Sequence, residues 1–354
     1  MLRVHRSKEL GGRRHPHASL GWVACLAAIL LCGCASSSPQ PALQRYDFKH
    51  PAMGTLFTMS VYSPDQPTAE SAAGEAFRRI DGLEEVMSDY QADSELMTLC
   101  DQPAGKPVAV SADLFDVIQR SCKFSEISEG AFDITVGPYV RLWRFSRKRK
   151  VLPAPADIEK ARATVGWRKL RLDAKAKTVT LLVPGMRLDL GGIAKGYAAD
   201  QALKVLKGRG LSRALVAASG DIALGEPPPG QPGWRVGVAG TGQGTNSVGK
   251  TLVLRNAAVS TSGDAEQYID IDGVRYSHIV SPATGLGLTE RVQATIVAPN
   301  ATTTDAMATT VSVLGLSRGM RLVESMPNVD ALMVTGTGAD KRTLESRHFS
   351  KFER

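Results

Sequence analysis

The stretch from Asp189 to Asp200, DLGGIAKGYAAD, contains the densest group of residues that could do chemistry. It follows a β-branched run and a Pro-Gly turn, and it leads into a predicted helix that ends near Gly208. Adjacent glycines let a backbone approach a ligand closely, and the amides at a helix N-terminus favour an anion. Lys195 adds a cation, and Asp189 adds a carboxylate for a hydroxyl or a metal. The glycines alone fit an ordinary turn equally well, but the mixture of Gly, Lys and Asp favours a ligand-binding loop.

A second candidate site opens the predicted helix from Thr302 to Leu314, which begins TTTDAMAT. Asp305 and Thr309 are four residues apart, so their oxygens lie on one helix face. A carboxylate and a hydroxyl suit Mg²⁺, which takes few protein ligands and completes its shell with water and substrate phosphates. The alternative is that Asp305 only stabilises the helix N-terminus. Together with the anion loop, the pair predicts a magnesium site.

The first 33 residues predict a secretory signal peptide, because a basic start is followed by an apolar run from about Ala18 to Leu31. The residues Leu-Cys-Gly-Cys that end at Cys34 are similar to a bacterial lipobox, which predicts cleavage before Cys34 and diacylglycerol on its sulfur. The run is short for a membrane span, and an uncleaved anchor is the alternative. We expect residues 34–47 to be the lipidated cysteine with a flexible tether, and residues 48–350 to be one domain.

The charge balance argues against a nucleic-acid partner. Residues 1–33 contribute a net +4 of the chain's +8, so the mature chain would carry about +4. We find no basic stripe interleaved with aromatic residues. The four consecutive cations from Arg147 to Lys150 are interpreted as a solvated loop.

After loss of the signal peptide and lipidation of Cys34, two cysteines remain, Cys100 and Cys122. They could pair in an oxidising compartment, but the sequence does not show that they are close. No Cys-x-x-Cys pattern or His/Cys cluster exists, so zinc is not expected.

The mature chain keeps three histidines, of which His278 is the acid–base candidate. It lies between a strand-like run and a Pro/Gly turn, flanked by serines, although a lone histidine is more often structural. Asp133, Asp221 and Asp264 stand at predicted strand ends, where site groups tend to lie, and each could instead be a turn-forming Asp.

The segment from Gly244 to Thr251 matches the phosphate-loop pattern G-x-x-x-x-G-K-[ST]. That pattern has a mechanism only between a strand and a helix. The residues that follow Lys250 are β-branched and apolar and predict a strand, so we interpret the segment as a hairpin connection.

Mixed strands and helices predict a single α+β domain of antiparallel sheet with packed helices. The expected helices are Ala69–Met87, Ser111–Ser128, Asp157–Val165, the segment ending near Lys207, and Thr302–Leu314. The expected strands are Phe48–Tyr62, a hairpin over Leu170–Val183, Ala214–Ala218, Trp234–Ala239, Thr251–Arg255, Tyr276 onward, Val292–Val297, Ala331–Thr335 and the region near Thr343.

Eight motifs in order, spread over roughly Phe48 to Ser346, together resemble the ApbE family, the FAD:protein FMN transferases. They are Met53-Gly-Thr55, Ser88-x-Tyr90 with Ser94-Glu95, Ala131–Pro138 with Leu142-Trp-x-Phe145, Asp189–Tyr197, Ser219–Ile222, Thr261–Asp264, His278–Gly285 and Thr302–Thr309.

The resemblance implies a T-fold-like domain and an enzyme that takes FAD and Mg²⁺. The enzyme would move FMN onto a threonine hydroxyl of a target protein as a phosphoester and release AMP. The implied targets are subunits of Na⁺-pumping NADH:quinone reductase and Rnf-type complexes. The implied location is the periplasmic face of a bacterial membrane, held by a lipid anchor on Cys34.

The resemblance also assigns site residues. His278 would assist the threonine nucleophile, and the Gly192 carbonyl, Asp305 and Thr309 would bind Mg²⁺. Contacts to FAD would come from Met53, Tyr90, Ala131, Phe132, Asp133, Asp189, Lys195 and Ile279.

Three positions depart from the family pattern. Ala308 replaces an Asp found in some members, and Ser219 stands where Gly is common. Ser281 replaces the usual Asp of the turn after His278, which leaves open how that turn is braced.

Two other readings remain open. One is a Mg²⁺-dependent FAD pyrophosphatase that uses water as the acceptor and gives FMN and AMP. The other is a non-catalytic FAD-binding lipoprotein, which would have no need of Asp305, Thr309 or His278.

Overall fold

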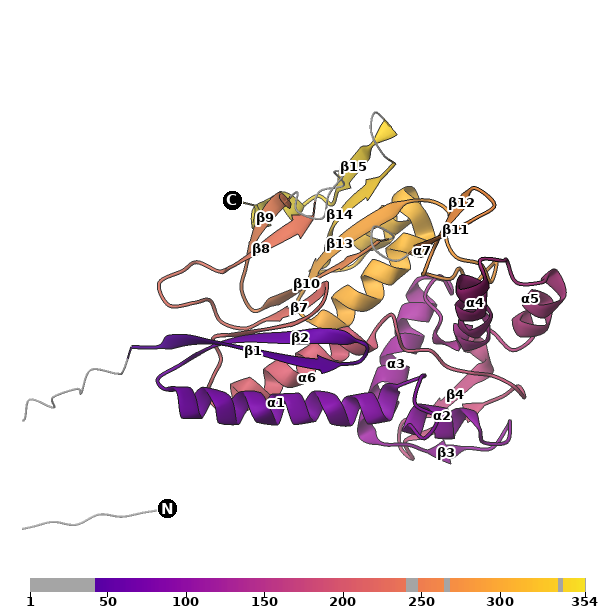
Figure 1. Ribbon diagram of the computed structural model, residues 1–354, viewed down its shortest axis with the longest axis horizontal. Helices are drawn as coiled ribbons and strands as arrows, with labels where there is room; N and C mark the ends of the chain where they lie inside the picture. The colour runs from indigo at the N-terminus through magenta and orange to yellow at the C-terminus, as the bar shows by residue number, and fades with distance from the viewer. Residues whose placement is uncertain (1–41, 240–247, 264–267, 337–339, 354) are drawn as a thin grey trace, which may run out of the picture. The chain divides into compact units, whose positions relative to one another are not determined.

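In the computed structural model, which describes residues 42–239, 248–263, 268–336 and 340–353, eight strands form one antiparallel sheet (Figure 1). Its strand order is β1-β2-β6-β7-β10-β13-β14-β15. The strands are β1 (Gln44–Ala52), β2 (Thr55–Ser63), β6 (Ala214–Ala218), β7 (Asp221–Leu224), β10 (Ala257–Ser262), β13 (Val292–Ala298), β14 (Asp330–Thr335) and β15 (Arg342–Glu345). The predicted fold class is confirmed.

The first two strands correct two expectations. One strand was predicted from Phe48 to Tyr62, but the chain turns at Met53-Gly54, and Ala52 pairs with Thr55. Both turn residues have positive φ (50° and 68°), the geometry of a two-residue type I′ turn. Methionine is not a typical turn residue, so the alternating pattern concealed the reversal. Since β1 begins at Gln44, the predicted tether was also too long at its C-terminal end.

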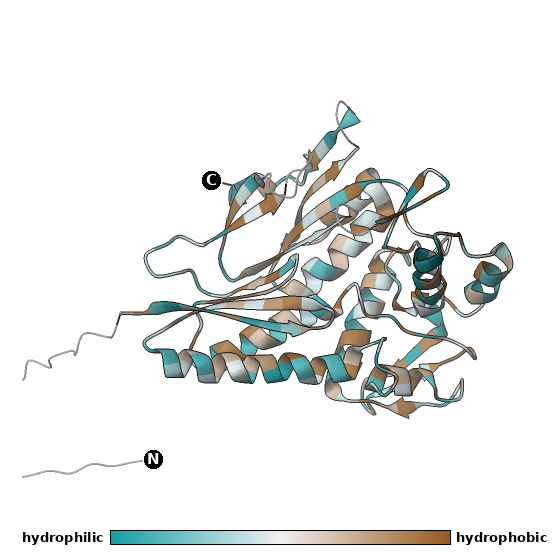
Figure 2. Cartoon of the chain, viewed as in Figure 1, coloured by the Kyte–Doolittle hydropathy of each residue, from teal (hydrophilic) through white to brown (hydrophobic). Residues whose placement is uncertain are grey.

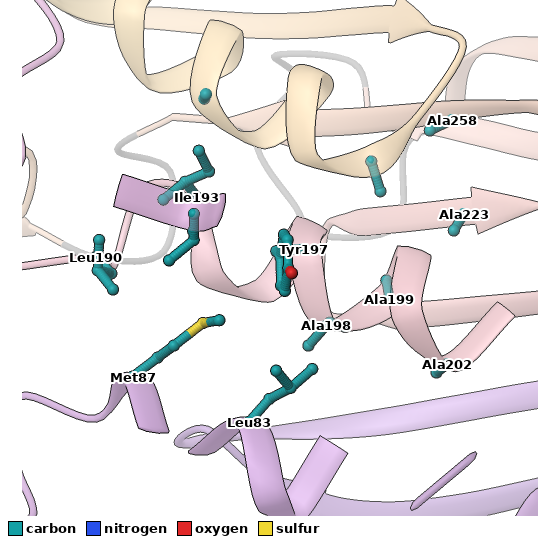
Figure 3. Packing of buried hydrophobic residues seen from close by; sticks show 14 of the residues in the cluster. Leu83, Met87, Leu190, Ile193, Tyr197, Ala198, Ala199, Ala202, Ala223 and Ala258 are labelled. Carbon is teal, nitrogen blue, oxygen red and sulfur yellow. The ribbon is translucent and has the colours of Figure 1, made fainter. Parts of the chain in front are cut away.

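Three long helices cover one face of the sheet: α1 (Gln66–Met87), α6 (Ala194–Gly208) and α7 (Ala301–Ser325) (Figure 1). The buried residues of α1 recur every three or four positions, as an amphipathic helix requires. In Figure 3, Leu190 and Ile193 precede α6 and share one core with Leu83 and Met87 of α1. This core therefore anchors the loop from Asp189 to Ile193.

The opposite face of the sheet packs against a hairpin of β8 (Trp234–Ala239) and β9 (Val248–Leu254) and against the C-terminal 3₁₀ turn η4 (Phe349–Phe352). Residues from Val248 onward form the predicted strand and no phosphate-binding helix, so the rejection of the phosphate-loop pattern is confirmed. Residues 244–247 and Asp264 lie outside the described residues.

The remaining elements lie at one end of the sheet (Figure 1). Tyr139, Trp143, Ile158 and Val280 form a separate core there, between helices and the β11–β12 hairpin. The elements are α2 (Glu95–Cys100), β3 (Val108–Ala109), α3 (Ala112–Ile127), η1 (Ile134–Val136), α4 (Gly137–Arg149), α5 (Pro155–Arg162), η2 (Trp167–Lys169), β4 (Leu170–Asp173), β5 (Thr178–Leu181), β11 (Tyr268–Ile271) and β12 (Val274–Ser277).

Helix α4 corrects another expectation. The basic run from Arg147 to Lys150 was interpreted as a loop, but it forms the last turn and the cap of this helix. Cations favour the negative end of a helix dipole, which explains why the run does not break the helix.

The two cysteines of the domain are separate thiols, with Cys100 buried and accepting a hydrogen bond from the Leu188 amide. Among the described residues, no helix is both long and apolar enough to cross a membrane.

Candidate functional site

A cavity of about 630 Å³ lies between the β1–β2 turn, the end of α1, helix α4, the loop before α6, and α7. Its size falls in the range of small-molecule sites. Every site residue that the resemblance assigns lines it except Asp305, and Asp221 does not line it either. The lining residues come from stretches far apart in the sequence: Met53, Tyr90, Ala131, Phe132, Asp133, Asp189, Gly192, Lys195, His278, Ile279 and Thr309.

The loop before α6 is shaped by Asp189. Its backbone amide donates to the Ile134 carbonyl over 2.7 Å, and its Oδ1 accepts from the Gly191 amide over 2.7 Å. Burial and the neighbouring Asp89 carboxylate raise the pKa of Asp189, because both disfavour the charged form. Asp189 therefore lines the cavity as a hydrogen-bonding group whose side chain is mostly buried.

Arg144 of α4 joins three cavity-lining residues that sequence analysis did not connect. Its Nη2 lies 2.5 Å from Asp89 Oδ2 and 3.5 Å from Asp189 Oδ2. Its guanidinium stacks over the Tyr90 ring, 3.9 Å from the centroid. Tyr90 is 79% exposed, so this stacking is what holds an otherwise solvent-facing aromatic ring at the cavity wall.

Lys195 lies between two buried carboxylates. Its Nζ is 2.6 Å from Asp221 Oδ2 of β7 and 3.7 Å from Asp305 Oδ1 of α7. Burial alone would lower the pKa of Lys195, but the two carboxylates raise it, so the side chain stays charged. Burial, followed by the charge of Asp221, raises the pKa of Asp305. The cluster carries two carboxylates against one ammonium and is short of positive charge.

The close approach of α6 to α7 depends on a glycine. A Cβ on Gly196 would lie 2.1 Å from the Ala301 carbonyl oxygen, and the Gly196 amide donates to Asp305 Oδ2 over 2.9 Å. Asp305 therefore accepts from one of the amides at the N-terminus of α6. We expected these amides to hold an anionic ligand. Further along, the two oxygens of Asp200 accept from the Ala301 and Thr302 amides, each over 2.8 Å.

These residues fit a divalent cation. A Cβ on Gly192 would lie 3.1 Å from Thr309 Oγ1, so the loop backbone approaches the α7 hydroxyl more closely than most side chains would allow. Asp305, one turn earlier on α7, adds a carboxylate that lacks full charge compensation. In the described ranges, no three His, Cys, Asp or Glu side chains are grouped to hold a metal. A small set of oxygen ligands of this kind suits Mg²⁺.

The segment from Ala131 to Asp133 presents backbone and an aromatic ring to the cavity. Asp133 Oδ1 accepts from the Thr135 amide and hydroxyl over 2.8 and 2.6 Å, and Oδ2 accepts from the Trp167 amide over 2.9 Å. Both oxygens hold the loop itself. Phe132 packs edge-on against Phe124 at 5.9 Å between ring centroids.

His278 directly follows β12 and is half-buried in the cavity wall. The preceding carbonyl, of Ser277, accepts from the indole nitrogen of Trp143 over 3.2 Å, so α4 fixes the backbone next to the histidine. Ser281 braces the following turn, since its Oγ accepts from the Thr284 amide over 3.4 Å and its carbonyl from the Gly285 amide. Of the other two histidines among the described residues, His50 is paired with Asp81 at 2.6 Å and does not line the cavity.

Ser219 lines the cavity at the β6–β7 turn with a φ of 56°. Glycine adopts this left-handed conformation at lower steric cost than serine does.

Sequence analysis missed Arg144 and Asp89, and it named Asp221 without a role. Arg144 sits in a run of aromatic and basic residues that was assigned to no element, so its helical face was not visible. The spacing of Val140, Trp143, Arg144 and Arg147, which together line the cavity, would have shown that face.

Comparison with known proteins agrees with the fold and with the family that the motifs resemble. The ApbE family model matches residues 53–333. An FAD:protein FMN transferase of Treponema pallidum is 35% identical over 344 residues, covering 92% of this chain and 93% of the relative. One of Vibrio cholerae is 31% identical over 337 residues, covering 94% and 98%. The solved structure titled flavin transferase ApbE from Vibrio cholerae has a TM-score of 0.80 at 29% identity and covers 88% of this chain and 99% of that one.

The fold is that of the flavin transferases. The chain belongs to the ApbE family. The predicted family, fold and enzyme class are confirmed.

Proposed function

We propose that this protein transfers FMN from FAD to a threonine hydroxyl of a target protein, with Mg²⁺ as cofactor and AMP as the second product. The observation that carries the proposal is the Lys195–Asp221–Asp305 cluster beside a cavity lined by residues of seven of the eight motifs that resemble the ApbE family. The shared name of its relatives, FAD:protein FMN transferase, supports the same activity.

In the proposed reaction, the threonine oxygen attacks the phosphorus on the FMN side of the FAD diphosphate. A new phosphoester P–O bond forms, and the bond from that phosphorus to the bridging oxygen breaks. The bridging oxygen leaves with AMP, and the hydroxyl proton passes to a base. No oxidant or reductant is needed, since the flavin keeps its oxidation state.

Lys195 supplies a fixed positive charge where a diphosphate would lie, and its two carboxylate partners hold it in place. Asp305, Thr309 and the Gly192 carbonyl would hold Mg²⁺, which would neutralise charge that develops on the phosphates. Tyr90, stacked on Arg144, offers an aromatic face to a flavin or adenine ring. His278 would orient the threonine hydroxyl and accept its proton.

The cellular setting is part of the proposal. We propose that residues 1–33 are removed, that Cys34 carries a lipid, and that the enzyme works at the periplasmic face of a bacterial membrane. The proposed targets are subunits of Na⁺-pumping NADH:quinone reductase or Rnf-type complexes. The lipobox-like residues before Cys34 support this setting.

A mass spectrum of a candidate target tests the reaction. The soluble domain of such a subunit is incubated with the enzyme, FAD and Mg²⁺, and its threonine-bearing peptides are analysed. We expect an added FMN on one threonine together with AMP, and neither product after chelation. AMP with free FMN and no adduct, for every candidate target, would favour the pyrophosphatase. Bound FAD that stays intact would favour a carrier.

A further inference from the structure

The C-terminal end of α4 carries more positive charge than the cavity or the helix uses. We define the α4 cationic end as Arg147, Lys148, Arg149 and Lys150. All four side chains are exposed, and residues 137–153 contain no acidic residue. Among the described residues, Arg144 is the one α4 cation that is paired with a carboxylate. Figure 2 shows α4 as a strongly hydrophilic helix.

The cavity accounts for one member of this cluster. Val140, Trp143, Arg144 and Arg147 line the cavity, so one face of α4 forms its wall. Lys148, Arg149 and Lys150 do not line it, and they extend the positive charge from the cavity wall onto the outer surface. A role in holding FAD therefore does not explain them.

The helix does not explain them either. A cation in the last turn stabilises a helix modestly through its dipole, but neighbouring like charges repel. Four consecutive cations therefore exceed what helix stability favours. The positive charge that neither the cavity nor the helix explains indicates a negatively charged partner.

On the basis of the proposed function, we infer that the α4 cationic end is the docking surface for an acidic segment of the target protein. A target that inserts a hydroxyl into the cavity must rest its remaining chain on the surface around it, and this surface continues the α4 wall. Opposite charge would raise the encounter rate and select among threonine-bearing segments.

An anionic membrane fits the surface less well. Interfacial helices insert an apolar face as well as presenting cations. The exposed apolar residues here are Phe145 (56%) and Val151 (60%), and the Arg149 guanidinium covers the Phe145 ring at 4.3 Å from its centroid. Little apolar surface is left for insertion into lipid.

A pair of matched charge reversals tests the inference in the full chain. The test variant is Lys148→Glu/Lys150→Glu, which leaves the cavity-lining Arg147 in place. The control is Lys204→Glu/Lys207→Glu, two exposed α6 lysines that line a different cavity. The two variants have the same net charge. The probes are fluorescently labelled short peptides with a central threonine and flanks rich in Glu, Ser or Lys.

We expect the wild type and the control to bind the Glu-rich peptide best, and the test variant to bind it about tenfold more weakly, with a weaker salt dependence. FAD affinity, measured separately by flavin fluorescence, should be the same in all three. Equal binding of the Glu-rich peptide by test variant and wild type would overturn the inference. So would a loss of FAD affinity in the test variant, which would assign the cluster to the nucleotide.

A third measurement follows binding of the protein to vesicles with and without an anionic lipid. Binding to anionic vesicles that depends on Lys148 and Lys150, without preference for the Glu-rich peptide, would assign the surface to the membrane and contradict the inference. Failure of the proposed function has a different signature: no AMP or FMN adduct forms with any acceptor, whatever the peptide binding shows.

Discussion

At the scale of single residues, the site is organised by charges that do not balance. Lys195 neutralises only part of the charge of Asp221 and Asp305, and Arg144 is shared between Asp89 and Asp189. Each group makes a short contact, and the four carboxylates are largely shielded from water, which strengthens their electrostatic interactions. The arrangement suits a substrate and a cation that bring the missing charges with them.

Replacing Asp305 should remove the cation site. In Asp305→Asn, the amide oxygen can still accept from the Gly196 amide, so the α6–α7 contact is kept while the negative charge is lost. We expect Mg²⁺ affinity, measured by calorimetry, to fall at least about tenfold. Thr309→Val is the milder companion variant, since it removes a neutral ligand. Unchanged Mg²⁺ binding in Asp305→Asn would mean that the ion binds elsewhere.

Replacing His278 should separate binding from chemistry. The residue lines the cavity, and its proposed task is to receive the threonine proton. We expect His278→Ala to slow FMN transfer by about 10²–10⁴-fold. FAD affinity, followed by fluorescence quenching, should change little. Full transfer activity in this variant would rule out the proposed role.

Replacing Arg144 tests the aromatic wall. Lysine keeps the charge but lacks the planar guanidinium that stacks on Tyr90 while reaching Asp89. We expect Arg144→Lys to raise the KM for FAD about tenfold with a smaller change in kcat, because ground-state binding is what it loses. An unchanged KM for FAD would show that Tyr90 needs no support from α4.

At the scale of elements, the site depends on the register between α6 and α7. Gly196 permits the contact, and Asp200 holds the N-terminus of α7 by accepting from two amides and from the Thr302 hydroxyl over 2.6 Å. Lys195 and Asp305 sit on either side of this contact. A shift of one helix along the other would therefore change the distances that define the cation site.

Removing the Asp200 carboxylate should weaken the contacts that fix the position of α7 relative to α6. Asp200→Ala leaves the first amides of α7 without their partners, and we expect a loss of about 2 kcal/mol in the free energy of unfolding. Transfer activity should fall about 10–100-fold, as for other residues that orient the groups of a site without contacting the ligand. Thr302→Val, which loses only one of the three hydrogen bonds, should show a smaller loss in urea denaturation and in activity. Equal effects of the two variants would argue against a role of the Asp200 carboxylate in holding the N-terminus of α7.

Several elements could be predicted from the sequence because their signals are local. Ser111 accepts from the Leu114 amide as the N-cap of α3, as its position before the apolar periodicity indicated. The β1–β2 turn was missed because Met53 gives no turn signal. Site residues were recognised by type and motif, but the contact between Gly196 and Asp305 joins residues 109 apart and depends on helix packing that the sequence does not display. Arg144 was missed for a different reason, because the residues around it were assigned to no helix and their helical spacing was not considered.

At the scale of the whole molecule, one ion pair links three helices. Arg79 of α1 lies 2.5 Å from Asp113 of α3, and Tyr197 of α6 donates to the same carboxylate over 3.1 Å. The hydrogen bond from Arg79 is the main cause that lowers the pKa of Asp113, against the opposing effect of burial. The pair thus connects the helix layer of the main sheet to the elements at its end.

This network should make stability depend on pH. Since the folded-state pKa of Asp113 lies below its unfolded value of about 3.9, its contribution is present above pH 4 and is lost as the pH falls through the folded-state pKa. We expect Asp113→Asn to cost about 2 kcal/mol at pH 7 and less at pH 3, measured by urea denaturation. The same cost at both pH values would show that the charge of Asp113 is not what stabilises the contact.

The most direct test of the proposed transferase activity is to measure AMP and acceptor-bound FMN in the same single-turnover reaction. Enzyme loaded with FAD and Mg²⁺ is mixed with an acceptor protein, and AMP and acceptor-bound FMN are quantified over one turnover. We predict one FMN on the acceptor for each AMP released, and no AMP when Mg²⁺ is chelated. AMP released in excess of bound FMN, unaffected by the acceptor, would contradict the transferase account.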